Sequence, residues 1–113
     1  MEEVKNSPVY LKNEAIERLD GNEELFEKVL EMFIAKTPSE IEKVSEAFLN
    51  KDYEKLIFHS HTIKGSAAII GAEKLRLACE KIEKASKQKQ SIEMIQPYVE
   101  ALNPIFNELN KVL

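Results

Sequence analysis

The chain has 113 residues, of which 43% are hydrophobic and 32% charged, and its net charge at neutral pH is −4. This size suits one domain over residues 1–113 and is too small for a cofactor-binding domain beside a catalytic one. The acidic balance argues against nucleic acid as a partner, and no apolar run is long enough to span a bilayer. Cys79 stands alone, which fits a reducing compartment, and the first residues lack the pattern of a signal peptide. We therefore expect a cytoplasmic chain, or the cytoplasmic part of a larger one.

Apolar residues recur at helical spacing along most of the chain. The first helix is expected over about residues 9–19, and the second over 22–36 with Asn22 as its N-cap. The run Thr37-Pro38-Ser39-Glu40 combines a capping box with proline at the first helical position. It predicts that a third, separate helix begins there and continues to about Leu49.

Asp52 is placed to cap a fourth helix, which Gly71 should end in a left-handed turn near Ile70. A fifth helix follows, and the polar residues 86–90 connect it to the last helix, which should start near Ser91.

Pro97 and Pro104 fall opposite the apolar stripe of the last helix, so we expect a bend or a late start there rather than a second domain. No segment alternates with the period of a strand. The pattern predicts an all-α fold, an antiparallel four-helix bundle with one or two extra short N-terminal helices.

The two histidines of the fourth helix receive different interpretations, because successive helical residues are about 100° apart. His59 falls on the side that carries the core residues, so we expect a packed or partly buried histidine with one hydrogen bond. His61 falls almost opposite and should be exposed. Any metal site made by these two side chains is disfavoured, since a spacing of two places them on different faces.

The neighbours of His61 favour a functional role for it. Lys64, Gly65 and Ala68 share its face, and glycine in mid-helix costs about 0.5–1 kcal/mol relative to alanine. Room for a bulky group beside the imidazole would explain Gly65. Ile57 and Phe58 flank the same face, and the small apolar surface suits docking of another protein.

A neutral imidazole is a competent nucleophile near neutral pH and could attack a phosphoryl donor through its exposed nitrogen. The other nitrogen then needs an acceptor. Glu83 on the next helix is a candidate, although a solvated surface glutamate is the simpler interpretation of that residue alone. Lys64 would offset phosphoryl charge, unless it is an ordinary surface lysine. The chain has no nucleotide loop and no carboxylate cluster for Mg²⁺, so donor and metal should come from a partner.

The chain carries a histidine, a lysine–glycine pair, small residues, a helix-ending glycine and later a leucine and a glutamate: His61, Lys64-Gly65, Ser66-Ala67-Ala68, Gly71, Leu75 and Glu83, with Cys79 between the last two. This pattern resembles the signature of the histidine-containing phosphotransfer (HPt) domains. Upstream, Leu19-Asp20-Gly21-Asn22 with Phe33 resembles the first turn and second helix of the family.

The resemblance implies a four-helix bundle that shuttles phosphoryl groups between aspartates of response-regulator receiver domains, in multistep phosphorelays that can include a hybrid histidine kinase. His61 matches the phosphorylated histidine, and Lys64 and Gly65 match the lysine and glycine beside the phosphoryl group. Glu83 matches the position that bonds the imidazole. Such a module has no kinase activity of its own and no cofactor, and Mg²⁺ belongs to the receiver domain.

Two alternatives remain open at this point. A chemotaxis-type histidine kinase carries a similar helix, and its phosphoryl donor is ATP held by a kinase domain that this sequence lacks. A helical bundle used only for binding, without phosphoryl chemistry, would also explain the apolar surface around Ile57 and Phe58.

Overall fold

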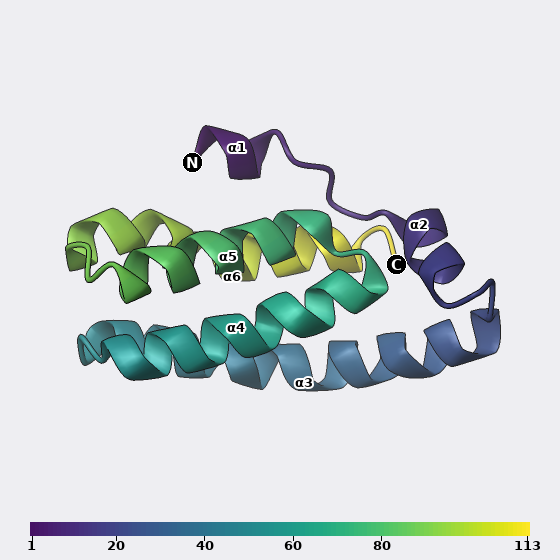
Figure 1. Cartoon of the computed structure of the whole chain (residues 1–113), viewed down its shortest axis with the longest axis horizontal. Helices are drawn as coiled ribbons and strands as arrows, with labels where there is room; N and C mark the ends of the chain where they lie inside the picture. Colours follow the sequence, from purple (N-terminus) through teal and green to yellow (C-terminus); the bar gives the residue numbers. More distant parts are fainter.

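The computed structural model describes residues 1–113 and consists of six helices without strands. Their bounds in chain order are α1 (Glu2–Lys5), α2 (Lys12–Arg18), α3 (Glu23–Leu49), α4 (Tyr53–Ile70), α5 (Glu73–Lys87) and α6 (Ile92–Asn110). The four long helices lie side by side along the 42 Å axis of the molecule, and short turns make sequential helices antiparallel (Figure 1). The two short helices precede this bundle in the chain. The expected all-α class is thereby confirmed.

Local chemistry fixes where α3 and α4 begin. The side chain of Asn22 accepts a hydrogen bond from the backbone N–H of Leu25 (3.0 Å), and Asp52 accepts one from Lys55 (3.1 Å). Each satisfies a backbone donor that the first turn of a helix leaves free. At the other end of α4, Gly71 adopts φ +83°, the left-handed conformation predicted for it. The bounds of α4, which carries both histidines, therefore follow from its flanking residues.

The predicted helix start at Thr37 is wrong. α3 continues through Pro38 without interruption, and the Thr37 hydroxyl donates to the carbonyl of Phe33 (2.6 Å) instead of capping a new helix. Phe33, Thr37 and Ile41 are all buried, so an unbroken helix keeps one continuous side in the core. Pro38 lies on the exposed side, where water can satisfy the carbonyl that loses its donor.

α6 likewise continues through its prolines because they lie on its exposed side. Pro97 and Pro104 are exposed as expected, but the helix begins at Ile92, directly after Ser91, so neither proline delays its start. At the N-terminus, α2 lies within the predicted helix over residues 9–19. α1 precedes it, so the chain has two short N-terminal helices, as the prediction of one or two allowed.

The core consists of 23 buried hydrophobic residues contributed by all six helices. α4 packs between α3 and α5, and the side that was expected to face inward is fully buried: Leu56, Ile63, Ala67 and Ile70. Its opposite side remains in contact with solvent. No helix combines the length and apolar character needed to cross a bilayer.

Candidate functional site

His61 lies on the solvent-facing side of α4, and 64% of its side chain is exposed. Its Nδ1 lies 3.0 Å from Oε2 of Glu83 on α5. One ring nitrogen therefore faces a carboxylate, and the ring itself projects to solvent. The structure brings together the two residues that the sequence placed on neighbouring helices.

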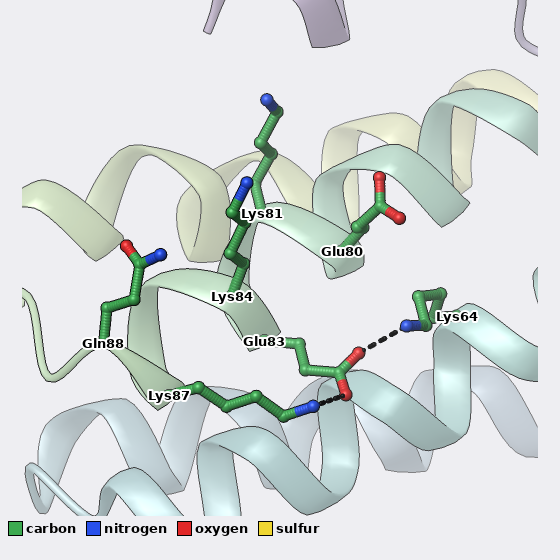
Figure 2. Close-up of a pocket in the computed structure, with 7 residues that line it drawn as sticks. All are labelled: Lys64, Glu80, Lys81, Glu83, Lys84, Lys87 and Gln88. Carbon is green, nitrogen blue, oxygen red and sulfur yellow. Dashed lines mark ion pairs between the residues drawn. The ribbon is translucent and has the colours of Figure 1, made fainter.

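Glu83 is not the solvated glutamate that its sequence position alone suggested, because only 6% of its side chain is exposed. The Glu83 carboxylate has three partners. Lys64 Nζ lies 2.7 Å from Oε1, and Lys87 Nζ and His61 Nδ1 each lie 3.0 Å from Oε2. Figure 2 shows the two lysines reaching this carboxylate from α4 and from the next turn of α5. A buried carboxylate is tolerated here because cationic donors surround it.

These contacts set the protonation of Glu83. Burial by itself would raise the pKa of the carboxyl group, but the ion pairs with Lys64 and Lys87 and the hydrogen bond with His61 outweigh it and lower the pKa from 4.5 to about 2. Glu83 is therefore ionised at neutral pH and can only accept hydrogen bonds. When the His61 ring carries a single proton, that proton therefore lies on Nδ1, and Nε2 carries a free lone pair.

Gly65 leaves open space beside the imidazole. A Cβ atom built on Gly65 would meet nothing within 4 Å, so no contact inside this chain requires a glycine there. Lys64 is half-buried, and its ammonium group lies against Glu83 rather than in solvent. The face around His61 thus combines an unobstructed approach with a cation held nearby.

An apolar surface surrounds the histidine, as the sequence indicated. The ring of Phe58 is 66% exposed, and Ile57 and Ala68 are partly exposed on the side of α4 that turns toward α5. Sequence reasoning missed Ile69, whose side chain is 49% exposed. Phe58 and Ile69 both lie on the outward side of α4. The helical spacing between them could therefore have identified Ile69 from the sequence.

His59 takes the partly buried position predicted for it. Its side chain is 15% exposed, and its Nδ1 lies 3.1 Å from Oε2 of Glu40 on α3. Its ring also meets the ring of Phe58 nearly edge-on, with centroids 5.0 Å apart. The two histidines share the same kind of carboxylate partner, and exposure is what separates them.

Lys87 is a second residue near the site that the sequence analysis did not single out. It lies four residues after Glu83, so the two side chains share one face of α5. No group of three or more histidine, cysteine, aspartate or glutamate side chains is arranged to hold a metal ion. The groups that meet at this site are an imidazole, a carboxylate and two ammonium groups.

The fold and the site define a class of protein: a helical bundle that presents one exposed histidine, oriented by a buried carboxylate and flanked by lysines. A family model described as the Hpt domain matches residues 28–111. This match covers most of the chain, and the chain belongs to the Hpt domain family.

Two curated proteins are similar in sequence. The phosphorelay intermediate protein rdeA of Dictyostelium discoideum is 29% identical over 94 residues, which are 83% of this chain and 37% of that protein. The phosphorelay intermediate protein YPD1 of Candida albicans is 36% identical over 66 residues, 58% of this chain and 36% of that protein. The chain thus spans little more than a third of the length of these relatives.

Two solved structures share the fold. The Hpt domain of an Hpt sensor hybrid histidine kinase from Shewanella superposes with a TM-score of 0.82 at 18% identity, over 92% of this chain and 89% of that one. Histidine-containing phosphotransfer protein B of Pseudomonas aeruginosa gives 0.79 at 17% identity, over 93% and 90%. Both superpositions cover a larger part of the chain than the 28–111 region that the family model matches.

Proposed function

We propose that residues 1–113 act as one phosphorelay domain, in which His61 accepts a phosphoryl group from the phosphoaspartate of a receiver domain and transfers it to a second receiver domain. The observation that carries the proposal is the bond between His61 Nδ1 and ionised Glu83, on a ring that is 64% exposed. It fixes the tautomer in which Nε2 is the nucleophile and points it away from the protein.

The transfer step can be written so that its bonds and charges balance. The Nε2 lone pair attacks phosphorus, the P–O bond to the donor aspartate breaks, and its electron pair leaves with the aspartate carboxylate. The proton on Nδ1 stays in place, so the phosphorylated ring is cationic and faces the negative charge of Glu83. In the onward transfer an aspartate oxygen of the second receiver attacks phosphorus, and the N–P electrons return to Nε2.

The remaining site residues have matching roles in this proposal. Lys64 offsets the negative charge of the phosphoryl oxygens, the usual electrostatic contribution to phosphoryl transfer. Gly65 leaves space for the phosphoryl group and the approaching receiver. Ile57, Phe58 and Ala68 form the apolar surface on which the receiver docks. In this proposal Mg²⁺, where it is needed, belongs to the receiver domain.

The setting we propose is the cytoplasm. The single thiol, Cys79, is fully buried, and burial raises its pKa, so it is neither exposed for disulfide formation nor reactive. Such a chain gains nothing from an oxidising compartment.

The two histidines provide the test of the site. The chain is mixed with a receiver domain that carries a radiolabelled phosphoryl group on its aspartate. The label transferred to the chain is then tested for the acid lability and base stability of phosphohistidine. We expect the variant His61→Gln to lose the label and His59→Gln to retain it, because both keep the helix but only one removes the exposed nitrogen. Circular dichroism confirms that both variants fold. Equal labelling of the two variants would refute the assignment of His61.

The same assay distinguishes the alternatives. Labelling of the chain by a histidine kinase with ATP, but by no phosphorylated receiver domain, would favour the phosphorylatable domain of a chemotaxis-type histidine kinase. Receiver binding without any transfer, unchanged in His61→Gln, would favour a module that only binds.

A further inference from the structure

The face of α5 next to Glu83 carries a pocket of about 450 Å³ that is lined entirely by charged and amide side chains. We name it the α5 lysine pocket; its residues are Lys64, Glu80, Lys81, Glu83, Lys84, Lys87 and Gln88. Four lysines and two glutamates give it a local excess of two positive charges, although the whole chain carries a net charge of −4. The pocket is therefore a basic region on an acidic protein.

The charges within this pocket are not all balanced internally. Lys64 and Lys87 are paired with Glu83, and Glu80 lies 3.6 Å from Arg76. Lys84 forms no ion pair with the other residues of the pocket, and its side chain extends beside that of Lys81 on the outer surface of α5 (Figure 2). Lys81 forms an ion pair with Glu3, whose side chain is 70% exposed. Exposed pairs of this kind contribute little, so Lys81 and Lys84 are available to an external anion.

The position of the pocket indicates what that anion belongs to. Glu83 and Lys64 are shared between the pocket and the proposed phosphoacceptor site, so the two are continuous. A protein interface of ordinary size covers about 800 Å² on each partner, more than the surroundings of a single histidine. A partner of that size centred on His61 would extend past Glu83 and Lys64 onto the α5 lysine pocket.

The expected partner carries the complementary charge. A phosphoaspartate site that holds Mg²⁺ must be built from oxygen ligands, chiefly carboxylates, so its surroundings are acidic. No hydrophobic residue lines the pocket, which disfavours a ligand with an aromatic ring or an acyl chain. We propose that Lys81 and Lys84 attract an acidic flank of the receiver domain and accelerate its association with the His61 face. This inference rests on the proposed function.

The experiment uses a pair of matched double variants of the full chain. Lys81→Gln/Lys84→Gln removes two positive charges from the pocket, and Lys12→Gln/Lys111→Gln removes two from exposed lysines on α2 and after α6. Stopped-flow association is measured against each receiver domain that labels the wild-type chain, in about 20 mM and about 500 mM salt. The rate of transfer within the bound complex is measured separately at saturating receiver concentration.

At low salt we expect the pocket variant to associate about three- to tenfold more slowly than wild type, within the range of electrostatic steering, and the control variant to differ less than twofold. At high salt the difference should disappear, because charges are then screened over about 4 Å. The transfer rate within the complex should be unchanged, since Lys64, Glu83 and Lys87 are intact.

Three results would overturn the inference. The first is equal association of the two double variants at low salt, and the second is an effect that persists at high salt. The third is tight binding of inorganic pyrophosphate that only the pocket variant loses, with receiver association unaffected, which would assign the pocket to a small anion. If no receiver labels wild-type His61, the proposed function fails instead. Normal labelling with no charge effect would remove only the role of Lys81 and Lys84.

Discussion

At the scale of single residues, Glu83 determines the chemistry of the site. Its carboxylate is buried, ionised and shared among one imidazole and two ammonium groups. It fixes the tautomer of His61 and holds Lys64 against α5. The same side chain that orients the His61 imidazole thus also holds the cations beside it, so a substitution there changes several features together.

The lowered pKa of Glu83 has a consequence for stability. A carboxyl group whose pKa is lower in the folded than in the unfolded state stabilises the fold at pH values above its ordinary pKa, 4.5, and this contribution is lost as the pH falls toward about 2. One pKa unit corresponds to about 1.4 kcal/mol, but Lys87 is largely exposed and its contribution is screened, so we expect about 1–2 kcal/mol in total.

Urea unfolding of wild type and Glu83→Gln between pH 7 and pH 2.5 measures this contribution. The difference in the free energy of unfolding between the two proteins should shrink as the pH falls below 4.5. A difference that stays constant down to pH 2.5 would show that Glu83 is not ionised preferentially in the folded state.

Gly65 should show opposite effects on stability and function. In Gly65→Ala the new methyl group meets no atom of this chain, and alanine is the better helix former, so the free energy of unfolding should rise by about 0.5–1 kcal/mol. The methyl group would nonetheless occupy the open space that we propose for the phosphoryl group and the receiver. We expect phosphoryl transfer to slow about tenfold, equivalent to about 1.4 kcal/mol of barrier. Thermal unfolding and transfer kinetics on one preparation test both effects, and an unimpaired transfer rate would contradict the proposed role of the open space.

At the scale of helices, the end of α4 depends on a close backbone approach. Gly71 adopts a positive φ, and its carbonyl accepts a hydrogen bond from Leu11 N–H (2.8 Å) in the segment before α2. A Cβ atom on Gly71 would lie 2.5 Å from the Leu11 carbonyl oxygen. This glycine therefore ends α4 and also seats the N-terminal segment against the bundle.

Gly71→Ala should destabilise the fold by about 3 kcal/mol, because strained backbone and a backbone collision add together. Gly21→Ala is the matched control: Gly21 also has a positive φ (+76°), but a Cβ there meets nothing within 4 Å. Strain alone should cost that variant about 1 kcal/mol. Equal destabilisation of the two variants in chemical unfolding would rule out the collision with Leu11.

At the scale of the whole molecule, the N-terminal segment is part of the packed structure although the family match begins at residue 28. Val4 is 1% exposed and belongs to the hydrophobic core. The N-terminal amino group donates to the hydroxyl of Tyr98 on α6 (3.1 Å), and Glu3 pairs with Lys81 on α5. α1 thus connects the two C-terminal helices without contributing to the site around His61.

This arrangement predicts a loss of stability without a loss of chemistry. Val4→Ala should lower the free energy of unfolding by about 2 kcal/mol, as expected for deleting buried methyl groups, and leave the transfer rate unchanged at 25 °C. Val112→Ala removes the same atoms from a side chain that is 56% exposed and should change stability by less than about 0.5 kcal/mol. A slower transfer in folded Val4→Ala would mean that α1 influences the site.

The sequence by itself determined the helical class, the bounds of α4 and which histidine faces water. Each of these depends on local chemistry: the 3.6-residue period, the Asp52 cap, the left-handed Gly71 and the angle between His59 and His61 on one helix. The same local reasoning failed at Thr37, since a capping box is only a local preference. Burial of Phe33, Thr37 and Ile41 on one side favours a continuous helix.

Only the tertiary structure decided what Glu83 and its neighbours do. Burial of that carboxylate, its bonds to His61, Lys64 and Lys87, and the lysine pocket beside it all depend on how closely α4 and α5 approach. The spacing of residues along one helix says nothing about that distance, because it is set by the packing of side chains from all the long helices.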